Sequence, residues 1–272
     1  LYVTGDLELS VASRYSDYST FGNTTNSEVG FQYQVNDMVG LRGTFSEAFR
    51  APSVPDLYGG TSLGYPTADD ACDNNTESGG QATAFCQANG VPATGFVSSI
   101  VQIPTLTGGN PNLEPETSES YTLGAVIDPI DGLTMTVDYW SIEIDNAVGT
   151  VGTTDLIRLC ATQGLYCDRT VRFSAPVSVI GQIIRVEDTN NNVGTETYTG
   201  VDLGIVADLP SIAGGDLTFD MQATYNEETQ VVTAGGLVVE NLAGTVTQTY
   251  GMYARWRALT KLNWNKGAIN VS

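Results

Sequence analysis

The fold class is decided by a stretch near the start of the sequence, Gly5-Asp6-Leu7-Glu8-Leu9-Ser10-Val11-Ala12-Ser13-Arg14-Tyr15. Its odd positions are mostly apolar and its even positions mostly polar, which is the period of a β-strand with two different faces. The same alternation recurs along the chain, for example at Val29, Phe31, Tyr33 and Val35 and at Leu217, Phe219, Met221, Ala223 and Tyr225. No stretch gives a convincing amphipathic helix. We therefore expect an all-β fold.

Composition excludes several classes of function. The chain has 31 acidic and 11 basic residues, a net charge of −20, which argues against nucleic-acid binding. It has no histidine, which removes Ser-His-Asp and Cys-His catalysis and His-ligated zinc. The acid pairs Asp69-Asp70 and Glu227-Glu228 lie in predicted loops without a partner base. We expect a protein that is not an enzyme and that holds no metal or other cofactor.

The connections between predicted strands are of two kinds. Short turns at 36–37, 128–132, 209–215 and 265–267 alternate with long irregular stretches at 49–117, 146–176 and 226–247. Outer-membrane β-barrels have short periplasmic turns and long extracellular loops, whereas compact soluble domains rarely carry such long insertions. The pattern favours a transmembrane barrel over a soluble sandwich. Residues 179–187 read as a strand, and the topology of 177–194 stays open.

The four cysteines form two near pairs, Cys72 with Cys86 and Cys160 with Cys167. Neither spacing is that of a zinc ribbon, so two local disulfides in an oxidising compartment are favoured over a four-thiolate zinc site. The run Asp188–Asn192 has alternating oxygen ligands like the start of a calcium loop, but its Gly and Glu positions do not fit, and a plain turn is favoured.

Two motifs flank the first long loop. Phe49-Arg50-Ala51-Pro52-Ser53-Val54-Pro55-Asp56-Leu57-Tyr58 ends one predicted strand, and Asn110-Pro111-Asn112-Leu113-Glu114-Pro115-Glu116-Thr117 opens the next. This pair resembles the signature of the TonB-dependent outer-membrane receptors. Two later strands, Val137–Ile144 and Thr199–Leu203, are similar to further family motifs in the same order. The resemblance covers most of the chain.

The resemblance implies an architecture and a location. It implies that residues 1–272 form part of a 22-stranded transmembrane antiparallel β-barrel with long extracellular loops, in the outer membrane of a Gram-negative bacterium. It also implies an N-terminal plug with a TonB box and final barrel strands, none of which this sequence contains, so we expect the chain to be a fragment of one receptor.

The resemblance further implies TonB-energised uptake of a scarce solute. The implied partners are the TonB complex, the plug, outer-membrane lipid and a small-molecule ligand. Because Asp155–Arg169 looks like a two-cysteine loop of large receptors, some of which import oligosaccharides, we favour an oligosaccharide over a ferric siderophore or cobalamin-type chelate. The alternative is a secreted soluble β-sandwich acting as a binding or adhesion module, which would have a dry apolar core between two sheets.

Candidate site residues fall into three groups. The signature residues are expected to be structural, and the Arg50 guanidinium is expected to make a bidentate contact with the carboxylate of Glu114 or Glu116. The loop aromatics Tyr58, Tyr65, Phe85 and Phe96 are candidates for stacking on a ligand. In a barrel the polar face lines the lumen, where Arg255, Arg257 and Lys261 would form a basic stripe. We expect these residues to form ion pairs with neighbouring lumen acids, and the alternative is that they face plug carboxylates or an anionic ligand. The other charges expected to line the lumen are Asp6, Glu8, Arg14, Glu28, Arg42, Asp138, Asp202 and Asp220.

Overall fold

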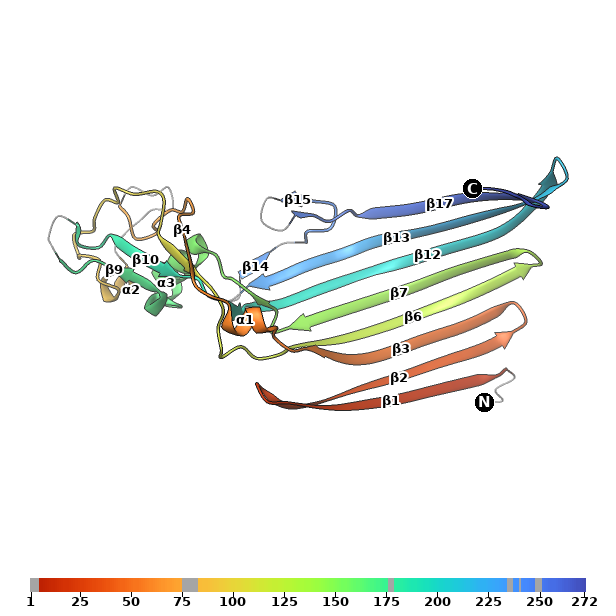
Figure 1. Cartoon of the computed structure of the whole chain (residues 1–272), viewed down its shortest axis with the longest axis horizontal. Coiled ribbons are helices and arrows are strands. Elements are labelled where there is room, and N and C mark those ends of the chain that lie inside the picture. The colour runs from red at the N-terminus through yellow and green to blue at the C-terminus, as the bar shows by residue number, and fades with distance from the viewer. Residues whose placement is uncertain (1–4, 75–82, 176–178, 234–236, 240, 248–250) are drawn as a thin grey trace.

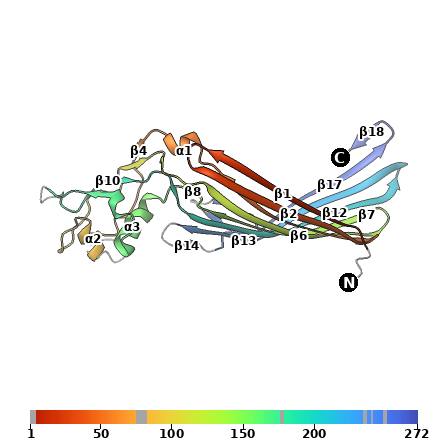
Figure 2. The same cartoon turned by 90° about the horizontal axis from the view of Figure 1, so that it is seen from below.

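A computed structural model describes residues 5–74, 83–175, 179–233, 237–239, 241–247 and 251–272 (Figures 1 and 2). Among these residues, ten strands form one curved antiparallel sheet in the order β1-β2-β3-β6-β7-β12-β13-β17-β18, with β14 beside β13. The strands are β1 (Leu7–Tyr18), β2 (Gly22–Asn36), β3 (Val39–Arg50), β6 (Glu116–Ile130), β7 (Leu133–Asp145), β12 (Gly194–Ile212), β13 (Gly215–Thr233), β14 (Leu237–Val239), β17 (Trp256–Lys266) and β18 (Ile269–Val271).

The connections alternate between the two ends of the sheet, as expected. Tight turns join β2 to β3, β6 to β7, β12 to β13 and β17 to β18 at one end, on the right of Figure 1. Three of them use a backbone with positive φ, at Gly132, at Ala213 with Gly214, and at Gly267. The long connections leave the opposite end. β12 and β13 run for 19 residues each, so 226–233, predicted as irregular, belongs to a strand.

The register separates the two faces predicted from the sequence. One cross-strand row contains Leu9, Phe31, Gly43, Leu123, Tyr139, Val201, Tyr225 and Trp256. The adjacent row, on the other face, contains Glu8, Gln32, Arg42, Gly124, Asp138, Asp202, Thr224 and Arg257. We call these the apolar face and the polar face. A slip of one residue would exchange them, so the alternation specifies the pairing.

No second sheet packs on the apolar face within the described residues. Its side chains stay open to the surroundings: Leu9 is 68% exposed, Val11 78% and Leu123 60%. The two buried hydrophobic clusters of the described chain lie elsewhere, one built around Ile103, Leu156 and Val186 and the other around the Cys72–Cys86 disulfide. This distribution lacks the dry inter-sheet core of the soluble β-sandwich alternative and suits a sheet whose apolar face meets lipid.

Residues 51–115 and 146–193 build a small folded unit at the loop end of the sheet, here called the loop domain (Figure 1). Its core is a four-stranded sheet in the order β4-β5-β10-β9. Its elements are α1 (Val54–Tyr58), β4 (Ser62–Gly64), α2 (Ala84–Ala88), β5 (Thr105–Thr107), β8 (Val148–Gly149), α3 (Thr153–Gln163), a 3-10 helix (Cys167–Arg169), β9 (Thr170–Arg172), β10 (Ile183–Glu187) and β11 (Asn191–Asn192). β15 (Val246–Thr247) and β16 (Gly251–Met252) form a separate pair.

Two sequence predictions need correction. α3 is an amphipathic helix that buries Leu156, Ile157, Cys160 and Ala161, although no helix was expected. With the equally buried Leu159, the apolar side chains are buried at positions i, i+1, i+3, i+4 and i+5, a helical spacing that does not show up as alternation. The strand predicted from residue 179 begins only at Ile183. None of the helices in the described ranges is long and apolar enough to span a membrane.

Candidate functional site

The base of the loop domain is fixed by Arg50 and Glu116, which face each other at the last position of β3 and the first of β6. The Arg50 guanidinium makes two hydrogen bonds to the Glu116 carboxylate, Nε to Oε2 and Nη2 to Oε1 at 2.6 Å, and its Nη1 lies 3.6 Å from Asp56 Oδ2. Glu116 also accepts the Val148 N–H at 2.7 Å. The predicted bidentate contact is therefore confirmed with Glu116, and it ties both long loops to the sheet.

Helix α1 continues the first motif. Ser53 caps it, and the Asp56 carboxylate accepts hydrogen bonds from the Ser53 N–H and hydroxyl in a capping box. These hydrogen bonds from Ser53, with the nearby Arg50 guanidinium, hold the pKa of Asp56 below its ordinary value. Pro52 and Leu57 are buried, while Phe49 makes edge contacts with Tyr18 and Phe21. The motif therefore places the chain as it leaves the sheet.

The second motif is held by the asparagine run that the sequence analysis treated as a turn. Asn110 donates from Nδ2 to the Asn190 carbonyl at 2.9 Å, and its N–H bonds the Asp56 carbonyl at 2.9 Å. Asn192 binds both the N–H and the carbonyl of Glu114 at 2.9 Å. The asparagines thus join the two signature motifs to the second long loop. The run Asn190–Asn192 is visible in the sequence, but the residues to which it hydrogen-bonds lie about 80 positions earlier in the chain.

The remaining signature residues complete the re-entry into the sheet. Leu113 is buried, and Asn110 Oδ1 accepts the Asn112 N–H at 3.0 Å in a local turn. Pro111 lies within this turn and Pro115 directly precedes β6, and neither ring nitrogen can donate to a ladder, which suits positions outside the strand. Ala51, between Arg50 and the buried Pro52, is half-buried.

Asp188 is a buried carboxylate that accepts hydrogen bonds from the backbone at the start of α3. It accepts the Val151 N–H at 3.0 Å and the Gly152 N–H at 3.1 Å, at the start of a helix that has no side-chain cap of its own. Burial raises the pKa of Asp188, although the two N–H groups and Arg169 oppose the rise. No group of three or more metal-ligating side chains occurs in the described part of the chain.

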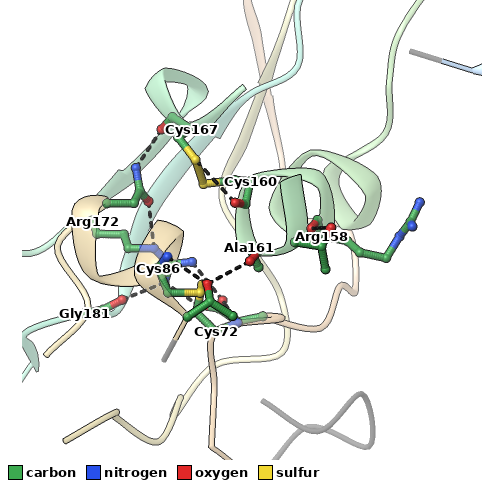
Figure 3. Close-up of a disulfide and its surroundings, with 12 residues drawn as sticks. Cys72, Cys86, Arg158, Cys160, Ala161, Cys167, Arg172 and Gly181 are labelled. Carbon is green, nitrogen blue, oxygen red and sulfur yellow. Dashed lines mark hydrogen bonds and ion pairs between the residues drawn. A yellow bond between two sulfur atoms is a disulfide. The ribbon is translucent and has the colours of Figure 1, made fainter. Parts of the chain in front are cut away.

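Both predicted disulfides are present, Cys72 with Cys86 and Cys160 with Cys167, which contradicts the zinc alternative (Figure 3). Beside them Arg172 forms an ion pair with Asp70 through Nη1 to Oδ2 at 2.6 Å and Nη2 to Oδ1 at 2.8 Å, and both side chains are only 2% exposed. Arg172 also donates to the Gly181 carbonyl and to Asn89. The disulfides and this ion pair stabilise the loop domain together.

The four loop aromatics are in different environments. Tyr58, at the end of α1, is 63% exposed, and Tyr65, after β4, is 56% exposed. Phe85 lies over Gly164, where an added Cβ would come 2.6 Å from its ring. Phe96 packs against the Cys72–Cys86 cluster with the Arg172 guanidinium 5.7 Å from its ring centre. Phe96 therefore packs its own loop, whereas Tyr58, Tyr65 and Phe85, which is 44% exposed, are open to a solute.

The predicted basic stripe has two members on the polar face rather than three. Arg257 and Lys261 lie opposite Thr224 and Asp220, and neither forms an ion pair within 4.0 Å with another described residue, so the expected pairing with lumen acids is wrong for them. Arg255 precedes β17 and donates instead to the Ala243 carbonyl at 2.6 Å and to the Tyr225 hydroxyl at 3.4 Å. These two contacts hold Arg255 at the base of the connection between β13 and β17.

A pocket that sequence reasoning missed opens near the loop end of β7, β12, β13 and β17. Its volume is about 400 Å³. It is lined mainly by Trp140, Tyr198, Asn226, Met252, Tyr253 and Arg257. A larger depression of about 590 Å³ continues along the polar face past Asp202 and Asp220 and shares Thr224 and Arg257 with the pocket. These residues come from four strands and the approach to β17, so no short motif marks them.

Comparisons with known proteins agree with this geometry. The family model described as "TonB dependent receptor-like, beta-barrel" matches residues 1–272. A mutant of the ferric enterobactin receptor of Pseudomonas aeruginosa superposes with a TM-score of 0.58 at 15% identity, covering 96% of this chain and 28% of that one. The siderophore receptor of Acinetobacter baumannii gives 0.52 at 15% identity, covering 95% and 37%. At such identity these structures share the fold, and this chain spans 28% and 37% of their lengths. No curated protein matches the chain.

Proposed function

This chain belongs to the TonB-dependent receptors, as part of their β-barrel, and on that premise we propose that it carries solute capture and passage in an outer-membrane importer. The family consists of receptors and transporters rather than enzymes, and its members lie in the outer membrane of Gram-negative bacteria. The observation that carries the proposal is the sheet with one apolar and one polar face, topped at a single end by the loop domain. The apolar face contacts lipid and the polar face lines the lumen.

We propose that residues 1–272 are one part of a longer receptor. The chain spans 28% of the length of the ferric enterobactin receptor that it resembles. Within the described residues β1 and β18 each pair on one side only, which leaves backbone groups for further strands. The longer protein would supply the remaining strands, the plug and the TonB box, through which the TonB complex energises transport.

Solute capture is assigned to the loop end. Tyr58, Tyr65 and Phe85 are exposed there and offer aromatic faces, while Phe96 supports its loop. Arg257 and Lys261 continue the path on the polar face and can meet plug carboxylates or polar groups of the passing solute. We keep the oligosaccharide as the favoured solute, with a ferric siderophore or cobalamin-type chelate as the second candidate.

The test is uptake by cells that carry the full-length receptor. Cells with the gene and a working TonB complex should grow on the transported solute when it is scarce, and deletion of either the receptor or TonB should abolish this growth. Cell fractionation should place the receptor in the outer membrane. Uptake that does not depend on TonB, or a receptor found free in the periplasm or medium, would contradict the proposal.

A further inference from the structure

We propose that the pocket lined by Trp140, Tyr198, Asn226, Tyr253 and Arg257, here called the lumen pocket, binds a neutral saccharide ring. The inference rests on the proposed function, because it names the ligand class for the lumen of the same importer. The lumen pocket lies on the polar face where the strands meet the loops, so a solute captured outside would reach it early. Its volume of about 400 Å³ falls within the roughly 300–1,000 Å³ of small-molecule sites.

The floor of the lumen pocket is aromatic. Trp140 lies against the backbone of Gly200 on β12, where a Cβ would come 2.4 Å from indole Cζ2. A glycine there lets the indole lie close over the neighbouring strand instead of standing away from the sheet. Tyr198 and Tyr253 add two further rings to the lining. The faces of such rings carry negative charge density and attract the C–H bonds of a sugar ring, which are weakly positive.

The polar groups of the lumen pocket suit hydroxyl groups. Arg257 offers several donors in a planar fork, whereas the Asn226 side chain is already hydrogen-bonded to Thr229 and fixes that wall of the pocket. Arg257 forms no ion pair within 4.0 Å with the other described residues, so its donors can meet a ligand. The Tyr198 hydroxyl already donates to Glu196 at 2.7 Å, which orients that ring. Saccharide hydroxyls both donate and accept, so they can accept from Arg257 and donate to the Tyr198 hydroxyl oxygen.

Charge separates a neutral ligand from the charged alternatives. The chain carries a net charge of −20, and Glu196 borders the lumen pocket while Asp202 and Asp220 line the adjoining depression. A multiply anionic chelate would be repelled by this field. A cation would be attracted by the aromatic faces but would meet the guanidinium of Arg257. A neutral polyhydroxylated ring incurs neither penalty.

The experiment measures binding to the full-length receptor in detergent. The probes are a panel of neutral oligosaccharides that includes maltohexaose, cellohexaose and xylohexaose, with ferric enterobactin as the anionic comparison. Calorimetry or tryptophan fluorescence follows binding to the wild type and to Trp140→Ala, Trp140→Phe, Tyr253→Ala and Arg257→Gln. Tyr15→Ala is the matched control, because Tyr15 is an exposed aromatic residue on the apolar face. Migration of the unheated barrel on gels verifies that each variant folds.

The inference predicts that at least one neutral oligosaccharide binds, and that Trp140→Ala and Tyr253→Ala weaken it at least about tenfold. Trp140→Phe should restore part of the affinity, and Tyr15→Ala should leave it unchanged. No binding from the neutral panel, binding that ignores Trp140 and Tyr253, or ferric enterobactin binding that requires them would each overturn the inference. TonB-dependent uptake of another solute would leave the proposed function standing in those cases, whereas loss of TonB dependence would remove it.

Discussion

Arg42 on β3 reaches across the whole width of β6 to Asp138 on β7 and forms two hydrogen bonds with its carboxylate, at 2.7 and 2.6 Å. The residue of β6 that lies between them in the register is Gly124. A Cβ at Gly124 would come 2.0 Å from Asp138 Oδ1 and 2.9 Å from the Val137 carbonyl oxygen. The ion pair on the polar face therefore requires a glycine at position 124, because any side chain there would occupy the position of the Asp138 carboxylate.

We predict that Gly124→Ala lowers the stability of the full-length barrel by about 1–3 kcal/mol, because the new methyl group displaces Asp138 and presses on backbone. Arg42→Gln should cost less, about 0–1 kcal/mol, since Arg42 is half exposed. Guanidinium unfolding followed by tryptophan fluorescence measures both. The control is Gly60→Ala, because Gly60 has no atom near the position of a Cβ. Gly124→Ala as stable as the wild type would contradict the account.

Arg50→Lys should loosen the base of both long loops. Lysine keeps the charge but cannot form the two parallel hydrogen bonds that Arg50 makes to Glu116. A loss of about 1 kcal/mol corresponds to roughly fivefold faster cleavage of the loop between β3 and β6 by chymotrypsin, if the loop opens and closes rapidly. Arg14→Lys, on the polar face of β1, is the matched control. Equal cleavage rates for the two variants would count against a structural role for Arg50.

Asp70→Asn should destabilise the loop domain strongly. The Asp70–Arg172 pair is almost fully buried, so removal of the carboxylate charge leaves the Arg172 guanidinium without its counter-ion. Loss of one partner of a buried pair costs about 3–5 kcal/mol. Hydrogen exchange should then be much faster in the loop domain, while the central strands of the sheet keep their protection. Unchanged exchange around the Cys72–Cys86 disulfide would show that this pair contributes little.

Asp188 should make the stability of α3 depend on pH. Burial raises its pKa above the ordinary value of about 3.9. Its favourable contribution is therefore complete below that ordinary value and is lost as the pH rises through the folded-state pKa. Asp188→Asn removes this titration while the amide oxygen can still accept the Val151 and Gly152 N–H groups.

The variant should thus gain stability relative to the wild type as the pH rises from 4 to 7. Hydrogen exchange of α3, corrected for the intrinsic exchange rates, measures the difference. Asp69→Asn, an exposed acid in the same domain, is the control. A stability difference between Asp188→Asn and the wild type that is constant over this pH range would contradict the assignment of Asp188 as a buried carboxylate of raised pKa.

The sequence predicted those features of the fold that depend on local pattern. Alternation along single strands placed Leu9, Leu123 and Tyr139 on one face and Arg42 and Asp138 on the other, and the register agrees. The two motifs predicted where the chain leaves and re-enters the sheet, and the Arg50–Glu116 pair is present there. These features follow from a period of two residues and from motifs of about ten residues, which one sequence displays.

Features that depend on distant contacts could not be predicted in the same way. Asn190 and Asn192 look like turn residues until the loop domain brings them to Asn110 and Glu114. The parallel pairing of β10 with β5 joins segments about 80 positions apart. The strand expected over 179–187 is shorter in the structure and covers only Ile183–Glu187. Trp140 lies within the Val137–Ile144 motif, but its role in the lumen pocket depends on Gly200 and Tyr253.

The most direct test of the central claim, that the apolar face meets lipid and the polar face lines the lumen, compares Leu123→Arg with Thr122→Arg in the full-length receptor. These neighbours lie at the same depth in the middle of β6 and point to opposite faces. An arginine facing lipid at mid-depth costs roughly 2–4 kcal/mol, whereas one facing the lumen is solvated. The account predicts that the amount of folded receptor in the outer membrane falls sharply for Leu123→Arg and little for Thr122→Arg. Equal assembly of the two variants, or the greater loss for Thr122→Arg, would contradict it.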